Sequence, residues 1–327
     1  MYIFAFMREV AFIKQNKEKW LEFENVILNN DKKSPDEIAD LHIKIMNDLS
    51  YAQSFYPKSK VVHYLNKLAK SSFSRVYHTK KQSNNSLLYF FFDVVPLLVY
   101  KRRKFIYASF VFFFICFIVG LISTFNDETF ARQILGNNYV DQTLENIQNN
   151  DALAIYKGGS NWGSFIGILD NNMRVGLNMF LSGLFLGVGT GFYIIYNGIM
   201  VAVFQSFFYQ HNTFLASIKG IWIHGTYEIF AMIIEAAAGY IIGASILFPG
   251  SLKRFQSFKI GLREAFIIFL STIPFTVTAA FLEGYITRFY NSIPTILCFV
   301  IIIFCLISIS YYYLVLPFKV ATKHQIR

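Results

Sequence analysis

One long apolar run constrains this chain more than any other feature. Residues 218–248 hold enough apolar side chains to cross a bilayer core of about 30 Å. The run contains His224, Glu228 and Glu235. On a helix, Glu228 lies roughly 40° and Glu235 roughly 20° around the axis from His224, so the three share one stripe. Because ionisable groups facing lipid are costly, we expect this stripe to face protein or a water-filled cavity.

The composition is that of an integral membrane protein. Of the 327 residues, 54% are hydrophobic and only 15% are charged. The three cysteines, Cys116, Cys298 and Cys305, lie inside apolar runs, so we expect no disulfide or thiol chemistry. The net charge is +10, and the basic residues lie where membrane topology would put them. We therefore expect no nucleic-acid partner.

The positions of the basic residues predict the topology. Four cations, residues 101–104, precede the apolar run 105–124 and place its start in the cytoplasm. Residues 125–173 carry six acidic residues against two basic ones, which suits the opposite side. We divide residues 174–209 into two short spans that turn near Tyr196 to Gly198. This gives six transmembrane helices with both termini cytoplasmic; the alternative has five spans and a partly re-entrant segment.

The fold class is therefore expected to be an all-α polytopic membrane protein with an N-terminal cytoplasmic helical region. We expect it in the bacterial cytoplasmic (inner) membrane, in contact with the lipid bilayer. The predicted parts are a cytoplasmic helical region (1–85), an interfacial helix with a basic stop (86–104), a first transmembrane helix (105–124), an extracytoplasmic loop (125–173), a membrane core of about five helices (174–317) and a cytoplasmic tail (318–327).

A further acidic residue, Glu283, lies on the next predicted span. If that span pairs antiparallel with residues 218–248, Glu283 falls level with Glu228. The sequence then predicts an intramembrane polar cluster of His224, Glu228 and Glu283 with Asn197, and with Glu235 deeper in the membrane. Carboxylates so close disfavour joint ionisation, so the cluster is expected to hold a proton or a cation.

The role of this cluster stays open at the level of sequence. A structural hydrogen-bond network is an alternative to a transport or catalytic site. Zinc binding is undecided: His224 and Glu228 are spaced i, i+4, but there is no HExxH motif and no cysteine ligand. No hydrolase motif and no phosphate-binding glycine loop is present in the sequence. We therefore expect a protein that is not an enzyme and has no cofactor.

Several short motifs follow one another along residues 90–286. They are Asn171-Asn172-x-Arg174, Gly187-x-Gly189-Thr190, Asn197-Gly198, His224-Gly225-Thr226-Tyr227-Glu228, Pro249-Gly250 and Ala279-x-x-x-Glu283. In this order they resemble the stage II sporulation protein M family, and the HGxxE motif is the most specific of them.

The resemblance implies a non-enzymatic polytopic membrane protein. In sporulating relatives the family is associated with septal membrane migration and engulfment, together with peptidoglycan-degrading partners. It marks His224, Gly225, Glu228 and Glu283 as important without giving them a chemical role, and Gly198, Pro249 and Gly250 as structural motif positions. The expected function is a membrane scaffold for envelope or peptidoglycan-remodelling proteins. The alternatives are a transporter or channel component and an intramembrane hydrolase; homo-oligomerisation stays open.

Overall fold

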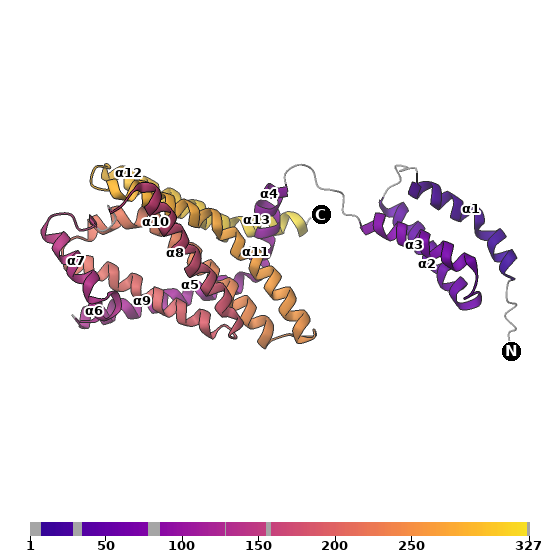
Figure 1. Cartoon of the computed structure of the whole chain (residues 1–327), viewed down its shortest axis with the longest axis horizontal. Helices are drawn as coiled ribbons and strands as arrows, with labels where there is room; N and C mark the ends of the chain where they lie inside the picture. The colour runs from indigo at the N-terminus through magenta and orange to yellow at the C-terminus, as the bar shows by residue number, and fades with distance from the viewer. Residues whose placement is uncertain (1–7, 29–34, 78–85, 128, 155–157, 326–327) are drawn as a thin grey trace. The chain divides into compact units, whose positions relative to one another are not determined.

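The computed structural model describes residues 8–28, 35–77, 86–127, 129–154 and 158–325 (Figure 1). The described residues form helices and no strand. The chain divides into two units, Met1–Ser86 and Leu87–Arg327. Each unit has a hydrophobic core of its own.

Three helices make up the N-terminal unit: α1 (Glu9–Leu28), α2 (Pro35–Phe55) and α3 (Lys60–Tyr77). Trp20 and Phe23 of α1 are buried against Ile45 of α2 and Leu65 of α3. The indole Nε1 of Trp20 donates to Oδ2 of Asp48 at 2.8 Å, so this buried polar group keeps a partner. Apolar residues at helical spacing thus assemble into a small three-helix core.

The second unit contains five helical stretches that are long and apolar enough to cross a membrane, among the described residues. They are Ser86–Asn126, Val188–Gln210, Phe214–Leu247, Arg254–Phe289 and Thr295–His324. Their constituent elements are α4 (Ser86–Tyr89), η1 (Phe90–Val94), α5 (Val95–Asn126), α9 (Val188–Gln210), α10 (Phe214–Leu247), α11 (Arg254–Phe281), η4 (Leu282–Ile286), η5 (Thr287–Phe289), α12 (Thr295–Ser310), η6 (Tyr311–Val315) and α13 (Leu316–Gln325). A unit built in this way is a multi-pass membrane protein.

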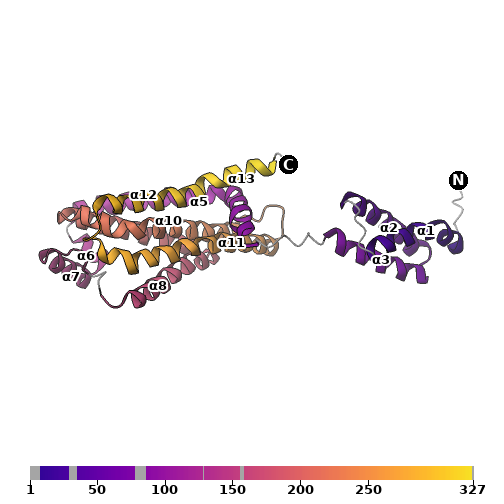
Figure 2. The ribbon, with the colours of Figure 1, turned by 90° about the horizontal axis from the view of Figure 1, so that it is seen from above.

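Helix α10 lies at the centre of the second unit (Figures 1 and 2). It packs against α5, α8 (Asn161–Leu181), α9, α11 and α12. Small residues such as Ala231, Ala238 and Gly239 line it and let neighbouring backbones come close. The surrounding helices turn apolar side chains outward, as lipid contact requires. On α5 and α12 these include Val111, Phe114, Ile118, Ile122, Ile296, Val300, Ile303 and Phe304.

Helix α8 explains why the predicted count of six spans is not confirmed. It lies along α10 and α11. Its residue Phe165 packs on Gly284 of η4, and Gly176 faces the Glu235 side chain of α10. However, α8 carries Asp170, the two asparagines of the NNxR motif and Arg174, and it is not among the apolar candidates. Five candidate spans plus a polar helix that accompanies them is the arrangement in the described residues.

The predicted turn near Tyr196 to Gly198 is wrong, because α9 continues through these residues. The chain reverses instead at η3 (Ser182–Leu184) and the residues that follow it. Gly187 has φ +82°, a left-handed conformation that glycine adopts without steric cost. A Cβ added to Gly243 of α10 would lie 2.5 Å from the Gly187 backbone nitrogen, so the turn docks directly on the central helix.

Two other boundaries differ from the sequence expectation. Helical structure runs from Ser86 to Asn126 without a break at the basic residues 101–104. Lys101 and Arg102 of this stretch pair with Glu264 of α11, at 2.5 Å and 2.7 Å respectively. The segment predicted as an extracytoplasmic loop holds α6 (Phe130–Leu135), α7 (Asn137–Gln148) and the first residues of α8.

Candidate functional site

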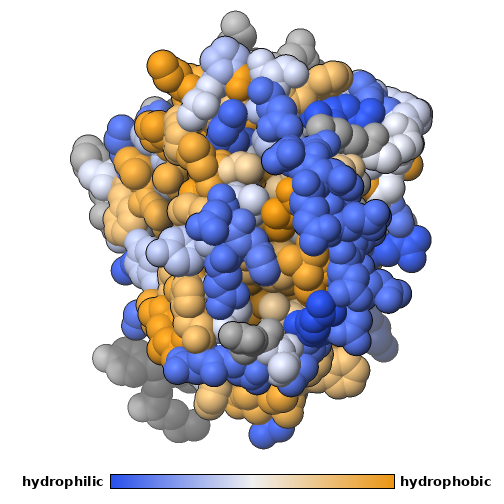
Figure 3. Space-filling view, turned by 90° about the vertical axis from the view of Figure 1, so that its left-hand side faces the viewer, coloured by the Kyte–Doolittle hydropathy of each residue, from blue (hydrophilic) through white to orange (hydrophobic). Residues whose placement is uncertain are grey.

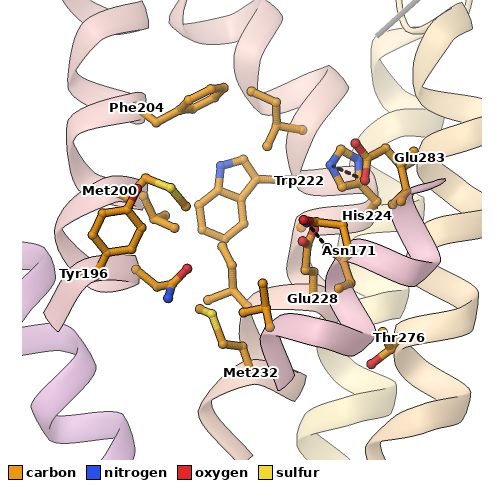
Figure 4. A pocket seen from close by; sticks show the side chains of 18 of the residues that line it. Asn171, Tyr196, Met200, Phe204, Trp222, His224, Glu228, Met232, Thr276 and Glu283 are labelled. Atoms are coloured by element: carbon orange, nitrogen blue, oxygen red, sulfur yellow. Dashed lines mark hydrogen bonds and ion pairs between the residues drawn. The ribbon is translucent and has the colours of Figure 1, made fainter. Parts of the chain in front are cut away.

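A cavity of about 650 Å³ lies on one face of α10, between α8 and α9 (Figure 4). Polar groups and apolar side chains both line it. The polar lining residues include Asn171, Asn172, Asn197, Gln205, His224, Glu228, Glu235, Thr276 and Glu283. The apolar ones include Tyr196, Met200, Phe204, Trp222, Ile229 and Met232. Tyr196 is 49% exposed whereas His224 is 3% exposed, so the cavity leads from the surface of the bundle into its interior.

Three side chains from two elements converge in this cavity. His224 and Glu228 lie one turn apart on α10, and Glu283 comes from η4. Nε2 of His224 lies 3.7 Å from Oε2 of Glu283. One nitrogen or oxygen atom of each of the three residues lies within 4.8 Å of the others. Figure 4 shows the three side chains beside one another. Such a set of donor atoms is able to hold a proton or a cation between them.

Thr287 of η5 orients the imidazole. Its hydroxyl donates to the Gly220 carbonyl at 3.1 Å and lies 2.9 Å from Nδ1 of His224. A hydroxyl has one hydrogen, so when it donates to Gly220 it accepts from Nδ1–H. The Nε2 lone pair is then directed at the side where Glu283 lies. Thr287 is not predictable from the sequence, because its contact with His224, 63 positions earlier, depends on the helix packing.

Glu235 lines the same cavity but stands outside the three-residue cluster. Its Oε1 accepts a hydrogen bond from Thr272 of α11 at 2.8 Å. Gly176 of α8 faces the carboxylate, and any side chain there would collide with it. Because Gly176 has no side chain, α8 leaves room for the buried Glu235 carboxylate of α10.

The other predicted site residues have distinct places. Asn197 lines the cavity from α9, and its Nδ2 donates to the Tyr193 carbonyl at 2.8 Å. Gly198 packs against α5 instead, where an added Cβ would come within 2.9 Å of Cys116. Gly225 borders the cavity, and its added Cβ would meet only Ile221, at 3.7 Å. Pro249 and Gly250 form the turn after α10 and lie outside the cavity lining.

The cationic side chains near the cluster are engaged elsewhere. Arg288 follows Thr287, but it donates to Asn161 and to the carbonyls of Gly158 and Gly159. Arg174 of α8 pairs with Asp170 at 2.7 Å on an exposed face. Among the described residues, no lysine or arginine forms an ion pair with Glu228 or Glu283. The carboxylates therefore lack a strong permanent countercharge from the described chain.

Figure 3 shows a broad patch of hydrophilic residues beside hydrophobic ones on the end of the membrane unit that holds α6 and α7. Ile134 and Leu135 of α6 and Tyr139 of α7 close the cavity on this side. Exposed acids here include Asp127 and Asp141, and Asp141 pairs with Arg132 at 2.7 Å. Hydrogen bonds from Thr129 to the exposed Asp127 carboxylate lower the pKa of that group. Asp127 therefore stays ionised and contributes negative potential at this end.

The fold and the cavity define a helical multi-pass membrane protein with a buried, carboxylate-lined chamber. Comparison with known protein families assigns the chain to one family within this class. The family described as "Stage II sporulation protein M" matches residues 109–288, more than half of the chain. The protein belongs to this family. The match contains all the short motifs from Asn171 to Glu283, and it confirms the family resemblance of the sequence.

Two further matches and one absence complete the comparison. Residues 10–78, which lie within the N-terminal unit, match a family described only as a domain of unknown function. An uncharacterised protein of Methanocaldococcus jannaschii is 32% identical over 126 residues, which cover 38% of this chain and 71% of that protein. No solved structure matches the chain.

Proposed function

We propose that this protein is a non-enzymatic membrane component that binds a small cationic solute in the α10 cavity and carries it across the bilayer. One observation supports the proposal above the others: three acids and a histidine line a chamber of about 650 Å³ inside a membrane domain. Ionisable groups at such depth are costly, and they typically mark solute or ion pathways. Transporters place such groups near the midplane beside interrupted helices.

The helices around the cavity have the interruptions that transport sites use. Helix α11 contains Pro274 and passes into the π-helical segment η4, which carries Glu283. Further along α10, at Gly239 and Gly243, α8 ends in η3 and the left-handed Gly187 before α9 begins. Irregular backbone beside a polar chamber supplies places at which helix segments can rotate to open one side or the other.

Flux through proteoliposomes tests the proposal. The full-length protein is reconstituted, and the uptake of radiolabelled methylammonium and of Zn²⁺ with an internal fluorescent chelator is measured. We expect saturable uptake of at least one of these cations, reduced at least tenfold in Glu228→Gln and in Glu283→Gln. Glu18→Gln, which alters an exposed acid of the N-terminal unit, is the control and should keep wild-type flux. No flux of either cation above empty liposomes counts against transport.

A scaffold for envelope or peptidoglycan-remodelling proteins is the second candidate, and an exposed ion pair favours it. Asp170 and Arg174 lie on α8 between Phe165 and Gly176, level with the buried cluster, and their side chains are 58% and 74% exposed. A charged pair facing acyl chains is costly, so a partner helix or a second copy is expected to cover it. In a mild-detergent pull-down, the double variant Asp170→Ala/Arg174→Ala should lose envelope proteins that the wild type recovers. Recovery of the same proteins with both argues against this surface.

The location and orientation are part of the same proposal. We infer a bacterial cytoplasmic membrane with the N-terminal unit and the C-terminus in the cytoplasm, since basic residues flank these ends. The acidic α6 and α7 end then faces outward and would attract cations toward the chamber. Labelling of single cysteines introduced at position 141 and in the N-terminal unit, in intact cells, tests this orientation.

A further inference from the structure

The three-residue cluster has the composition and geometry of a site for one divalent transition-metal ion. We infer that Nε2 of His224 and one carboxylate oxygen each of Glu228 and Glu283 bind Zn²⁺ or a similar late first-row ion. This inference rests on the proposed function in one respect: if the cavity transports a cation, the site names the class of that cation. The binding itself does not require transport.

The distances are close to those that zinc needs. Tetrahedral ligands about 2.0–2.1 Å from zinc lie roughly 3.4 Å from one another. The separation of His224 Nε2 from Glu283 Oε2 is 3.7 Å, and all three donor atoms lie within 4.8 Å. The largest separation, 4.8 Å, exceeds the ideal value by about 1.4 Å. The terminal torsion of a glutamate is broad, so its rotation brings the carboxylate oxygens closer to the imidazole nitrogen.

The donor types select the class of metal. An imidazole nitrogen with two carboxylates suits zinc and neighbouring transition metals. Calcium takes six to eight oxygen ligands and magnesium favours octahedral oxygen sites that keep water, so both are poorly served by this set. Three protein ligands leave one tetrahedral position open. The cavity lies against the three residues and gives a solute or water access to that position.

The surroundings hold the imidazole in the form that binds metal. The hydrogen bond between Nδ1–H of His224 and Thr287 Oγ1, at 2.9 Å, leaves the Nε2 lone pair for coordination. Metal-bound histidines almost always donate their second nitrogen to such an outer partner, which fixes both tautomer and ring orientation. Thr287 is itself fixed by its hydrogen bond to the Gly220 carbonyl at 3.1 Å.

Charge balance favours the same assignment. Two ionised carboxylates and a neutral imidazole carry a charge of about −2 in a low-dielectric interior, which is unfavourable without compensation. Among the described residues, the nearby Arg288 and Arg174 have other partners, namely Asn161 and Asp170. A single divalent ion neutralises the two carboxylates. Glu235, two turns further along α10, accepts from Thr272 and is not required for this balance.

Equilibrium binding tests the site on the untagged full-length protein in detergent micelles. After chelation and desalting, ZnCl₂ is titrated calorimetrically and the retained metal is measured by mass spectrometry. We expect one Zn²⁺ per chain, and at least a hundredfold loss of affinity in Glu228→Gln and in Glu283→Gln. Glu235→Gln is the matched control, an acid of the same cavity outside the cluster, and should stay within threefold of wild type.

A second measurement needs no variant. Zn²⁺ but not Mg²⁺ should raise the Tm of the wild-type protein, because ligand that binds only the folded state stabilises it. No saturable zinc binding, or equal affinity in wild type and both cluster variants, overturns the inference. Zinc binding without zinc flux in proteoliposomes supports the site and contradicts transport. Methylammonium flux without zinc binding supports transport and overturns the metal site.

Discussion

His224 of α10 and Glu283 of η4 meet inside the membrane unit, with Nε2 and Oε2 3.7 Å apart. The two residues are far apart in the chain, and only the antiparallel packing of α10 with α11 and η4 brings them together. Their neighbours separate into two kinds. Glu228 completes the cluster and Thr287 orients the imidazole. Glu235 and Thr272 form a separate hydrogen bond two turns further along α10, with Gly176 facing the Glu235 carboxylate.

Removing the Thr287 hydroxyl should weaken metal binding without unfolding the protein. Thr287→Val keeps the shape of the side chain but takes the hydrogen-bond partner from Nδ1 of His224. Loss of such an outer partner typically costs about 10–100-fold in metal affinity. Zinc calorimetry measures the effect. Thr278→Val, at an exposed position of α11, is the control and should bind as wild type does; equal affinity in both variants shows that Thr287 does not orient the imidazole.

Two glycines of α10 should respond in opposite ways to alanine. A Cβ at Gly239 would lie 2.6 Å from the Met179 carbonyl oxygen, so Gly239→Ala should lower stability by about 1–3 kcal/mol. Gly225 borders the cavity, and its Cβ would meet only Ile221, at 3.7 Å. Gly225→Ala should therefore leave the Tm unchanged or slightly raised. Thermal unfolding in detergent separates the two; a lower Tm for Gly225→Ala than for Gly239→Ala contradicts the packing described here.

The pairing of α5 with α11 should depend on Glu264. Its carboxylate accepts from Lys101 and Arg102, and the residue is 8% exposed. Glu264→Gln leaves two cations with weaker partners, and we expect a loss of about 1–3 kcal/mol in the free energy of unfolding. Asp141→Asn breaks an exposed pair and should cost only about 0–1 kcal/mol. Similar Tm values for the two variants would show that the α5 to α11 pairing contributes little.

The N-terminal unit should lose stability at high pH through Tyr64. Burial, followed by the hydrogen bond from its hydroxyl to Glu24, raises the pKa of Tyr64 to about 12. A folded-state pKa above the unfolded value of about 10 stabilises the protonated, folded form at lower pH. That stability is fully present below pH of about 10 and is lost as the pH rises toward 12. Absorbance titration at alkaline pH measures it, and Tyr64→Phe should remove this part of the transition.

Helical periodicity made part of the site predictable. Positions four and seven residues apart on one apolar helix share a face, so the sequence alone predicts one stripe for His224, Glu228 and Glu235. The stripe does line a single cavity. Matching depths along two antiparallel helices then placed Glu283 beside Glu228. The first step uses only helix geometry, which the sequence determines locally. The second step also assumes that the two helices pack antiparallel, as α10 does with α11 and η4.

The remaining features depend on contacts between distant segments. The Asn197-Gly198 pair has the composition of a turn, yet α9 continues through it because Gly198 lets α5 approach at Cys116 and Phe113. The real reversal uses Gly187 at φ +82°, in a glycine-rich stretch that offered several alternatives. Thr287 and Thr272 have ordinary sequence surroundings. Only the packing of their segments on α10 reveals what they bind.

X-ray absorption at the zinc K-edge, on the full-length protein loaded with one equivalent of Zn²⁺, tests the central assignment most directly. The account predicts a four-coordinate ion with nitrogen and oxygen ligands at about 2.0–2.2 Å, and outer-shell scattering from a single imidazole. In Glu228→Gln and in Glu283→Gln this imidazole scattering should disappear, because zinc no longer binds at the site. Sulfur ligands at about 2.3 Å, or a spectrum unchanged by both substitutions, would place the metal elsewhere and contradict the account.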